Sequence, residues 1–454
     1  MTSLRHDKAR RIVLVSRSQS GEALRSAQAI AKLAQVCLLG ISQYLPLADD
    51  GRIFVDHLQV ENIHDSNQLI LAARALVDKH AGLDLIVTTT ETLLEPVAQA
   101  NESLGLQGMT VSTVNQVLDK SRLKSVLAGA GLPTARDCMI SSDEIARNFV
   151  AEVGFPIVFK PIKGSGGLAT WCIQSAEQLD LALQVLQVST SDPVLAEAYI
   201  YGQELCIDTI TLRNEPRFYS LCFYRPSILD ALQNPRTQWC CILPRDITGE
   251  PYQDFIEQGL KAIRALSVGN AMTHMEGFLA RGGEVCFTDA TLRPAGARIA
   301  PMLAFAYDID PYFAWARAVV DGRFDGPWER KYAVGTIFLR GIGSGLIQSE
   351  QGIESVRRDF GDLIVEAHMP RIGTAKSSTY TGDGFVTVRH PITQIVEDAL
   401  QLIAQTVHIS YSETDSIAPL TGSRREAWNQ QSRYFHHDSS RPVWENNCLP
   451  NLDD

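Results

Sequence analysis

The first hundred residues alternate short apolar runs with amphipathic helical patterns. The apolar runs are Ile12–Ser16, Val36–Gly40 and Leu83–Thr89, and the helical patterns lie at Gly21–Ala34 and Asn67–Lys79. Strands separated by amphipathic helices are typical of a parallel, doubly wound sheet. The turn after the first strand, Ser16–Gly21, lacks the three-glycine fingerprint of dinucleotide-binding proteins, so we do not expect a nicotinamide cofactor.

A second unit begins after a predicted helix over Asn115–Ala130, which ends at glycines and Pro133. Its pattern predicts strands at Ile157–Pro161 and Ala169–Ile173, a helix at Ala176–Gln187, strands at Val194–Ile200, Leu205–Leu212 and Phe218–Tyr224, and a hairpin within Met272–Leu292. Beyond a helix that follows Pro311, strands at Val334–Arg340, Leu363–Met369 and Phe385–Val388 predict a small closing β-rich subdomain. The residues after about Tyr411 form a polar extension.

Composition and charge narrow the class of protein. The 454 residues are 45% hydrophobic and 20% charged, which is typical of soluble globular chains, and their number predicts about three structural units. The net charge of −11, without a basic block, disfavours a nucleic-acid partner. The nine cysteines include no CxxC pair, no apolar run approaches a membrane span, and the run Ile12–Val15 is too short for a signal peptide. We therefore expect a cytoplasmic protein with no membrane contact.

A glycine-rich turn between two predicted strands is a candidate phosphate loop. Lys160 and Lys163 precede Gly164, Ser165, Gly166 and Gly167. Glycines allow the backbone amides to approach a ligand, Ser165 adds a hydroxyl, and the lysines supply positive charge for phosphate. The order of residues excludes a Walker A motif. A flexible hairpin with solvated lysines explains this segment alone equally well.

Two carboxylates, Glu197 and Glu204, follow about thirty residues later around a strand end and Gly202. A carboxylate leaving a strand can accept hydrogen bonds from a purine amino group or from ribose hydroxyls, and the backbone around Ala198 and Ile200 can bond the adenine edge. The pattern alone favours the simpler interpretation of exposed glutamates at a turn.

The predicted hairpin carries His274 and Glu276 on one strand and Asp289 and Arg293 at the end of the other. Two acidic groups brought together in an apolar sheet are costly unless a cation neutralises them. Carboxylate oxygens beside a nucleotide indicate magnesium. Arg293 can direct its donors at a carboxylate or a developing anion, whereas His274 is interpreted as a structural residue.

Together these motifs resemble the ATP-grasp superfamily, and within it the carboxylate–amine ligases similar to L-amino-acid ligases and dipeptide synthetases. The resemblance covers roughly residues 10 to 410. Its motifs, in order, are Asp119–Lys120 in a helix ending at Gly129–Pro133, Val158–Pro161 with the glycine loop, Glu197–Glu204, His274–Glu276, and Asp289–Arg293 with Gly296. Many relatives have Glu at the position of Asp289 and Asn at that of Thr291, so the number of bound magnesium ions is left open.

The resemblance implies a set of ligand-binding residues. Lys120, Lys160 and the loop residues Ser165, Gly166 and Gly167 would hold the ATP phosphates, Glu197, Ala198 and Ile200 the adenine, Glu204 the ribose, and Glu276 and Asp289 the Mg²⁺, for which Mn²⁺ would substitute. Lys163 and Arg293 would be catalytic. Arg225, Gly296, Ala297 and Arg298 would contact the substrates.

The implied fold class combines α/β and α+β architecture: a Rossmann-like, doubly wound N-terminal domain and a nucleotide cleft between two α+β subdomains. The predicted boundaries are residues 1–112 for the N-terminal domain, 113–201 for the small ATP-grasp subdomain, 202–330 for the large one, 331–411 for the closing subdomain and 412–454 for the extension.

The implied activity is the ATP-dependent joining of a small carboxylate, such as an amino acid, to an amine through an acyl phosphate, in peptide-like natural product biosynthesis. The expected partners are these small molecules, and a homodimer is one oligomeric state to test. A carboxylase-like or nucleotide-precursor enzyme and a noncatalytic ATP-binding module are the alternatives. No biotinyl-lysine context is present, which disfavours the first of these.

Overall fold

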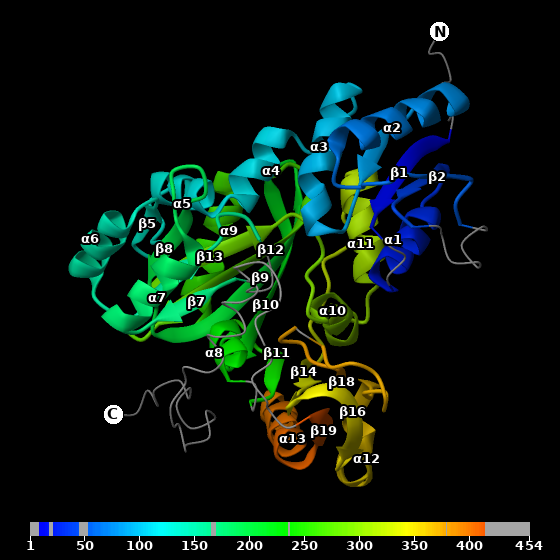
Figure 1. Cartoon of the computed structure of the whole chain (residues 1–454). Helices are drawn as coiled ribbons and strands as arrows, with labels where there is room; N and C mark the ends of the chain where they lie inside the picture. Colours follow the sequence, from blue (N-terminus) through cyan, green and yellow to red (C-terminus); the bar gives the residue numbers. More distant parts are fainter. Residues whose placement is uncertain are drawn as a thin grey trace.

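The computed structural model describes residues 9–17, 21–44, 53–164, 169–234, 237–377 and 379–413 (Figure 1). The N-terminal sheet has the order β3-β2-β1-β4, and all of its strands are parallel. Its elements are β1 (Arg10–Ser16), α1 (Gly21–Ala31), β2 (Val36–Ser42), β3 (Asp56–Gln59), α2 (Ser66–His80), β4 (Leu85–Val87) and α3 (Leu94–Ser103).

Alternation along β1 explains why this sheet is covered on both faces. Ile12 and Leu14 lie in one hydrophobic cluster with residues of α1, whereas Val13 and Val15 lie in another with residues of α2. Successive side chains of a strand point to opposite faces, so a continuous apolar run requires a helix on each side. The predicted parallel, doubly wound arrangement is confirmed.

The helix predicted over Asn115–Ala130 is instead two helices, α4 (Val111–Leu118) and α5 (Lys120–Gly129). Asp119 lies between them in an extended conformation, and its side chain accepts hydrogen bonds from the backbone N–H groups of Ser121 and Arg122. Aspartate is a strong N-cap and a weak helix-interior residue, so the chain restarts the helix here. As a result, Lys120 is the first residue of α5.

The next unit is an antiparallel sheet with the order β5-β8-β6-β7. Its elements are β5 (Asp137–Ile140), α6 (Asp143–Val153), β6 (Ile157–Lys160), β7 (Trp171–Ile173), α7 (Ala176–Leu186) and β8 (Val194–Ala198). Ile157 and Phe159 of β6 pack with both helices in one cluster. Because side chains alternate along a strand, Lys160 and, on β8, Glu197 belong to the face opposite these helices.

The largest sheet has eight strands in the order β13-β12-β9-β10-β11-β14-β18-β17, all antiparallel. These strands are β9 (Gly202–Leu212), β10 (Glu215–Arg225), β11 (Trp239–Leu243), β12 (Ala271–Ala280), β13 (Val285–Thr291), β14 (Ala333–Leu339), β17 (Ile364–His368) and β18 (Gly384–His390). One face packs on α5 and α9 (Tyr252–Leu266), and the other on α8 (Ile228–Gln233), α10 (Ile299–Tyr307) and α11 (Pro311–Ala316). The side chains of the two faces alternate, as with Leu205 and Cys206 of β9.

The strands predicted to form a closing subdomain mostly continue this large sheet. β14 pairs with β11, so that Val334 lies opposite Leu243 and Phe338 lies opposite Trp239. β18 pairs with β14, and β17 pairs with β18. A separate three-stranded sheet contains only β15 (Gly341–Ile342), β16 (Ser344–Gln351) and β19 (His408–Glu413), beside α12 (Ile353–Phe360) and α13 (Thr393–Thr406). Residue 331 therefore does not mark the start of a new sheet.

None of the helices within the described ranges has the length and apolar character needed to span a membrane.

Candidate active site

A pocket lies where the open face of the small sheet meets β12 and β13 of the large sheet. Most of the predicted ligand-binding residues line it: Lys120, Lys160, Glu197, Ala198, Ile200, Glu204, Glu276 and Asp289. Val158, Ile228 and Thr288 add to its wall, and Gly164 lies at its rim. The predicted loop residues Ser165, Gly166 and Gly167 lie outside the described residues.

Lys120 enters the pocket from the first turn of α5. Its side chain is buried, its Nζ lies 2.9 Å from Asp289 Oδ2, and it donates a hydrogen bond to the carbonyl oxygen of Gly164 at 2.8 Å. Burial by itself would lower the pKa of Lys120, but the carboxylate of Asp289 outweighs this effect and the pKa is raised. Asp289 therefore stabilises the charged form of Lys120 at this position in the pocket.

Glu197 lies between two buried lysines. Its Oε2 is 2.7 Å from Lys160 Nζ and its Oε1 is 2.7 Å from Lys124 Nζ. Burial would raise the pKa of Glu197, but the two ammonium groups hold it below its usual value. Burial also lowers the pKa of Lys160, and the charge of Glu197 offsets part of that decrease. Glu197 thus holds Lys160 in place, and its predicted contact with adenine stays a prediction.

Sequence reasoning missed Lys124, which a local signal could have indicated. Lys124 follows Lys120 by four residues on α5, and residues four apart lie on the same face of a helix. Its Nζ also donates a hydrogen bond to the carbonyl oxygen of Ala135 at 3.1 Å. The side chain is only 4% exposed, so it supports Glu197 from behind the pocket.

Glu276 and Asp289 are directly paired residues of β12 and β13. Glu276 Oε1 accepts a hydrogen bond from the hydroxyl of Tyr224 at 2.9 Å and lies 3.3 Å from His274 Nε2. Burial would raise the pKa of Glu276, but the interaction with His274 outweighs burial, so the pKa of Glu276 is lowered. For Asp289 burial dominates, and its pKa is raised. Two facing carboxylates that line a pocket form a donor set that fits a hard divalent cation.

Glu204 is almost completely buried at the start of β9. Its Oε2 accepts a hydrogen bond from the backbone N–H of Ile228 at 2.6 Å, which anchors the start of α8 against the pocket. Burial, and then the nearby charge of Glu276, raises the pKa of Glu204 well above its usual value.

A second pocket adjoins the first and shares Glu276, Asp289 and Ile228 with it. It contains the predicted residues Arg293, Gly296 and Ala297, together with Glu91, Tyr224, His274, Thr291 and Tyr380. Arg293 Nη2 lies 2.8 Å from Glu91 Oε2. Ala297 has a φ of 48°, a left-handed conformation that is strained for a residue with a side chain.

Sequence reasoning missed Glu91, Tyr224 and Tyr380 in this second pocket. Glu91 belongs to the N-terminal unit and is 202 residues from its partner Arg293, and Tyr380 follows β17 near the other end of the chain. No local spacing connects these positions, so only the packed structure could identify them.

Three predicted residues lie outside both pockets. Lys163 Nζ contacts Glu95 Oε2 at 2.8 Å and Asn115 Oδ1 at 2.7 Å. Arg225 Nη1 lies 3.0 Å from Glu397 Oε2. Arg298 pairs with Glu366, and its guanidinium lies over the ring of Phe385. The structure gives each of these side chains a partner away from the pockets, and their roles in catalysis or substrate binding stay predictions.

Comparisons with known proteins bear on this arrangement. Residues 119–205 match the family described as carbamoyl-phosphate synthase L chain, ATP binding domain. The chain is 22% identical over 250 residues to alanine–anticapsin ligase of Bacillus subtilis (strain 168), covering 50% of this chain and 52% of that protein. It is 25% identical over 277 residues to an L-arginine-specific L-amino acid ligase of Bacillus subtilis, covering 59% of this chain and 64% of that protein. The match thus spans about half to two thirds of these relatives.

The fold is also similar to that of a solved enzyme. The crystal structure of the L-amino acid ligase from Bacillus licheniformis superimposes with a TM-score of 0.71 at 17% identity, covering 89% of this chain and 100% of that one. This likeness extends well beyond the matched ATP-binding segment and confirms the predicted fold class. It shows that the chain has the ATP-grasp fold, and in sequence the chain is similar to the ATP binding domain and the two ligases named above.

Proposed function

We propose that this protein joins a small carboxylate, such as that of an amino acid, to an amine, with conversion of ATP to ADP and phosphate through an acyl phosphate. The observation that carries the proposal is the junction of the two pockets at Glu276 and Asp289. A phosphoryl donor in the first pocket and a carboxylate in the second would meet at this junction.

The first pocket has the chemistry that ATP requires. Lys120 and Lys160 offer ammonium groups to phosphate oxygens, and Lys124 and Glu197 keep Lys160 in position. Glu276 and Asp289 would hold Mg²⁺, or Mn²⁺ in its place. When bound, the cation offsets negative charge on the transferring phosphoryl group. We assign the adenine to the strand segment around Ala198 and Ile200.

The second pocket suits a substrate that carries both a negative carboxylate and a positive ammonium group. Arg293 supplies a guanidinium, whose donors can bind a carboxylate and stabilise the oxyanion formed when an amine attacks the acyl phosphate. Glu91 supplies a negative charge next to it, which suits the ammonium group of an amino acid. Charge complementarity therefore favours amino acids over carboxylates that lack an ammonium group.

A matrix of carboxylates and amines tests the proposal. ADP release and product mass are measured for each pair of amino acids, with bicarbonate and formate as additional acids and Glu276→Gln as the inactive control. We expect ADP release that depends on both substrates, with a product whose mass equals their sum less one water. ADP release only with bicarbonate or formate would indicate the carboxylase-like or nucleotide-precursor alternative. ATP binding with no turnover would indicate a noncatalytic module.

A further inference from the structure

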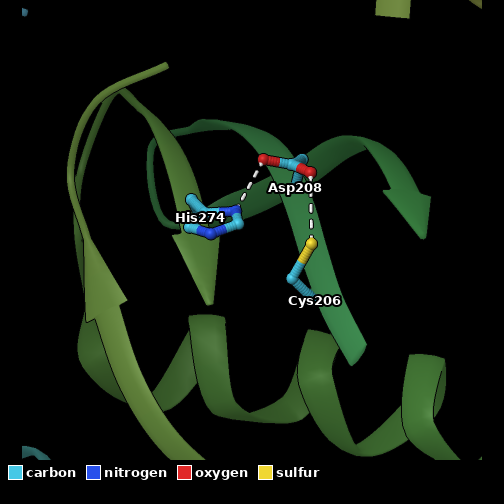
Figure 2. Close-up of side chains that lie close together, drawn as sticks. All are labelled: Cys206, Asp208 and His274. Carbon is cyan, nitrogen blue, oxygen red and sulfur yellow. Dashed lines mark hydrogen bonds and ion pairs between the residues drawn. The ribbon is translucent and has the colours of Figure 1, made fainter. Parts of the chain in front are cut away.

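A row of buried polar side chains lies behind Glu276 in the central sheet. Figure 2 shows Cys206, Asp208 and His274 turned toward one another from two adjacent strands. His274 Nδ1 lies 3.0 Å from Asp208 Oδ1, and Asp208 is 1% exposed. On the other side of the ring, His274 Nε2 lies 3.3 Å from Glu276 Oε1. The imidazole therefore connects a buried carboxylate to one at the pocket.

The strand register explains this alignment. Asp208 on β9 and His274 on β12 are directly paired, and Glu276 follows His274 by two residues, so both point from the same face of β12. Tyr224 on β10 reaches the same carboxylate and donates to Glu276 Oε1 at 2.9 Å. Three strands of one continuous sheet thus contribute to holding a single oxygen atom.

The two oxygens of Glu276 differ as a consequence. Both His274 and Tyr224 approach Oε1, whereas no hydrogen bond from another described residue reaches Oε2. Asp208 restricts rotation of the imidazole through its contact with Nδ1. Side chains that hydrogen-bond to a ligating carboxylate orient it and increase its affinity for a metal ion.

We propose that Asp208 and His274 are positioning residues that hold Glu276 Oε1 and so direct Oε2 toward the divalent cation. This inference rests on the proposed function, in which Glu276 holds that cation. His274 is then more than the structural residue that the sequence predicts, because its ring transmits the constraint from Asp208.

The same cluster has a competing interpretation as a metal site. One ligand atom each from Cys206, Asp208 and His274 lie within 4.8 Å of one another. However, Asp208 and His274 already satisfy each other at 3.0 Å, and the thiol of Cys206 reaches Asp208 Oδ2 only at 3.9 Å. Cys206 is paired with Glu276 across β9 and β12, but among the described residues its thiol makes no hydrogen bond to the Glu276 carboxylate, so Cys206→Ser is the matched control.

The test measures binding of Mn²⁺ in the presence of ADP by electron paramagnetic resonance, without turnover. Asp208→Asn and His274→Gln are each expected to weaken Mn²⁺ binding by roughly 10- to 100-fold, the usual effect of losing a side chain that orients a metal ligand. Affinity for ADP alone should be unchanged, and Cys206→Ser should bind Mn²⁺ like the wild type. Folded Asp208→Asn or His274→Gln protein with wild-type Mn²⁺ affinity would overturn the proposal.

Further measurements separate the remaining outcomes. Wild-type Mn²⁺ affinity in Glu276→Gln would overturn the proposed metal role itself, whereas weak binding in Glu276→Gln together with normal binding in Asp208→Asn would overturn only the positioning role. A stoichiometric transition metal that is lost in Cys206→Ser would establish the competing site instead. If the variants do not fold, a crystal structure of the wild type with Mg²⁺ and ADP decides: Oε1 should keep its contact with His274 while Oε2 binds the cation, and loss of that contact would refute the proposal.

Discussion

Replacing Glu197 with glutamine should strongly destabilise the protein, although the change is nearly isosteric. The carboxylate is 4% exposed and lies 2.7 Å from the ammonium groups of Lys124 and Lys160. At an effective dielectric constant of about 20, each contact corresponds to about 6 kcal/mol of Coulomb attraction. The cost of removing all three charges from water offsets much of this attraction. Removing one partner of a buried ion pair nevertheless costs about 3–5 kcal/mol, because the remaining charge is left uncompensated.

Urea unfolding followed by tryptophan fluorescence measures this loss in the free energy of unfolding. The matched control is Glu152→Gln, which breaks a surface pair between Glu152 and Arg136 whose side chains are 55% and 67% exposed. Exposed pairs contribute about 0–1 kcal/mol, so this variant should unfold like the wild type. A loss below about 1 kcal/mol in Glu197→Gln would refute the reasoning, since it would mean that the two lysines do not depend on this carboxylate.

The same variant should also alter nucleotide binding with a defined pH dependence. Burial already lowers the pKa of Lys160, and Glu197 offsets part of that effect. Without the carboxylate the pKa should fall further, so the ammonium form is lost as the pH rises. Affinity of Glu197→Gln for ATP should therefore decrease between pH 6 and pH 9 more steeply than that of the wild type, in a titration calorimetry series. Parallel pH profiles would contradict this expectation.

Three further predictions concern other parts of the chain. Lys160→Ala should weaken ATP binding more than Lys163→Ala, because only Lys160 lines the pocket, and equal effects in a nucleotide titration would contradict this placement. Ala297→Trp should raise the Michaelis constant for a bulky substrate but not for ATP, since Ala297 lines only the second pocket; destabilisation with unchanged substrate preference would disprove it. Asp56 has its pKa lowered from 3.8 to about 2, chiefly by a hydrogen bond from Lys79. The stability advantage of the wild type over Asp56→Asn should therefore be complete above pH 4 and shrink as the pH falls toward 2, as checked by thermal melting.

Many of the residues that line the first pocket could be predicted because their signals are local. The two glutamates around Gly202 and the acids of the β12–β13 hairpin lie within short segments whose strand patterns are clear. Strand alternation then places Glu276 on the same face as His274, and hairpin pairing brings Asp289 opposite. The resemblance to a known family predicted that these segments meet in one cleft. The structure places them around one pocket, and the comparison with solved structures confirms the fold class.

The pattern of apolar and polar residues was enough to predict the doubly wound N-terminal sheet, most strands of the two later sheets, and most residues of the first pocket. Four contacts could be found only in the folded chain: Glu91 meets Arg293, Tyr380 lines the second pocket, Lys163 pairs with Glu95, and β14 extends the central sheet. Hydrophobic periodicity reports which side of a strand or helix is buried, within a few residues. Contacts between residues hundreds of positions apart depend on how whole layers pack, because a charged side chain takes its partner from whichever layer is brought against it.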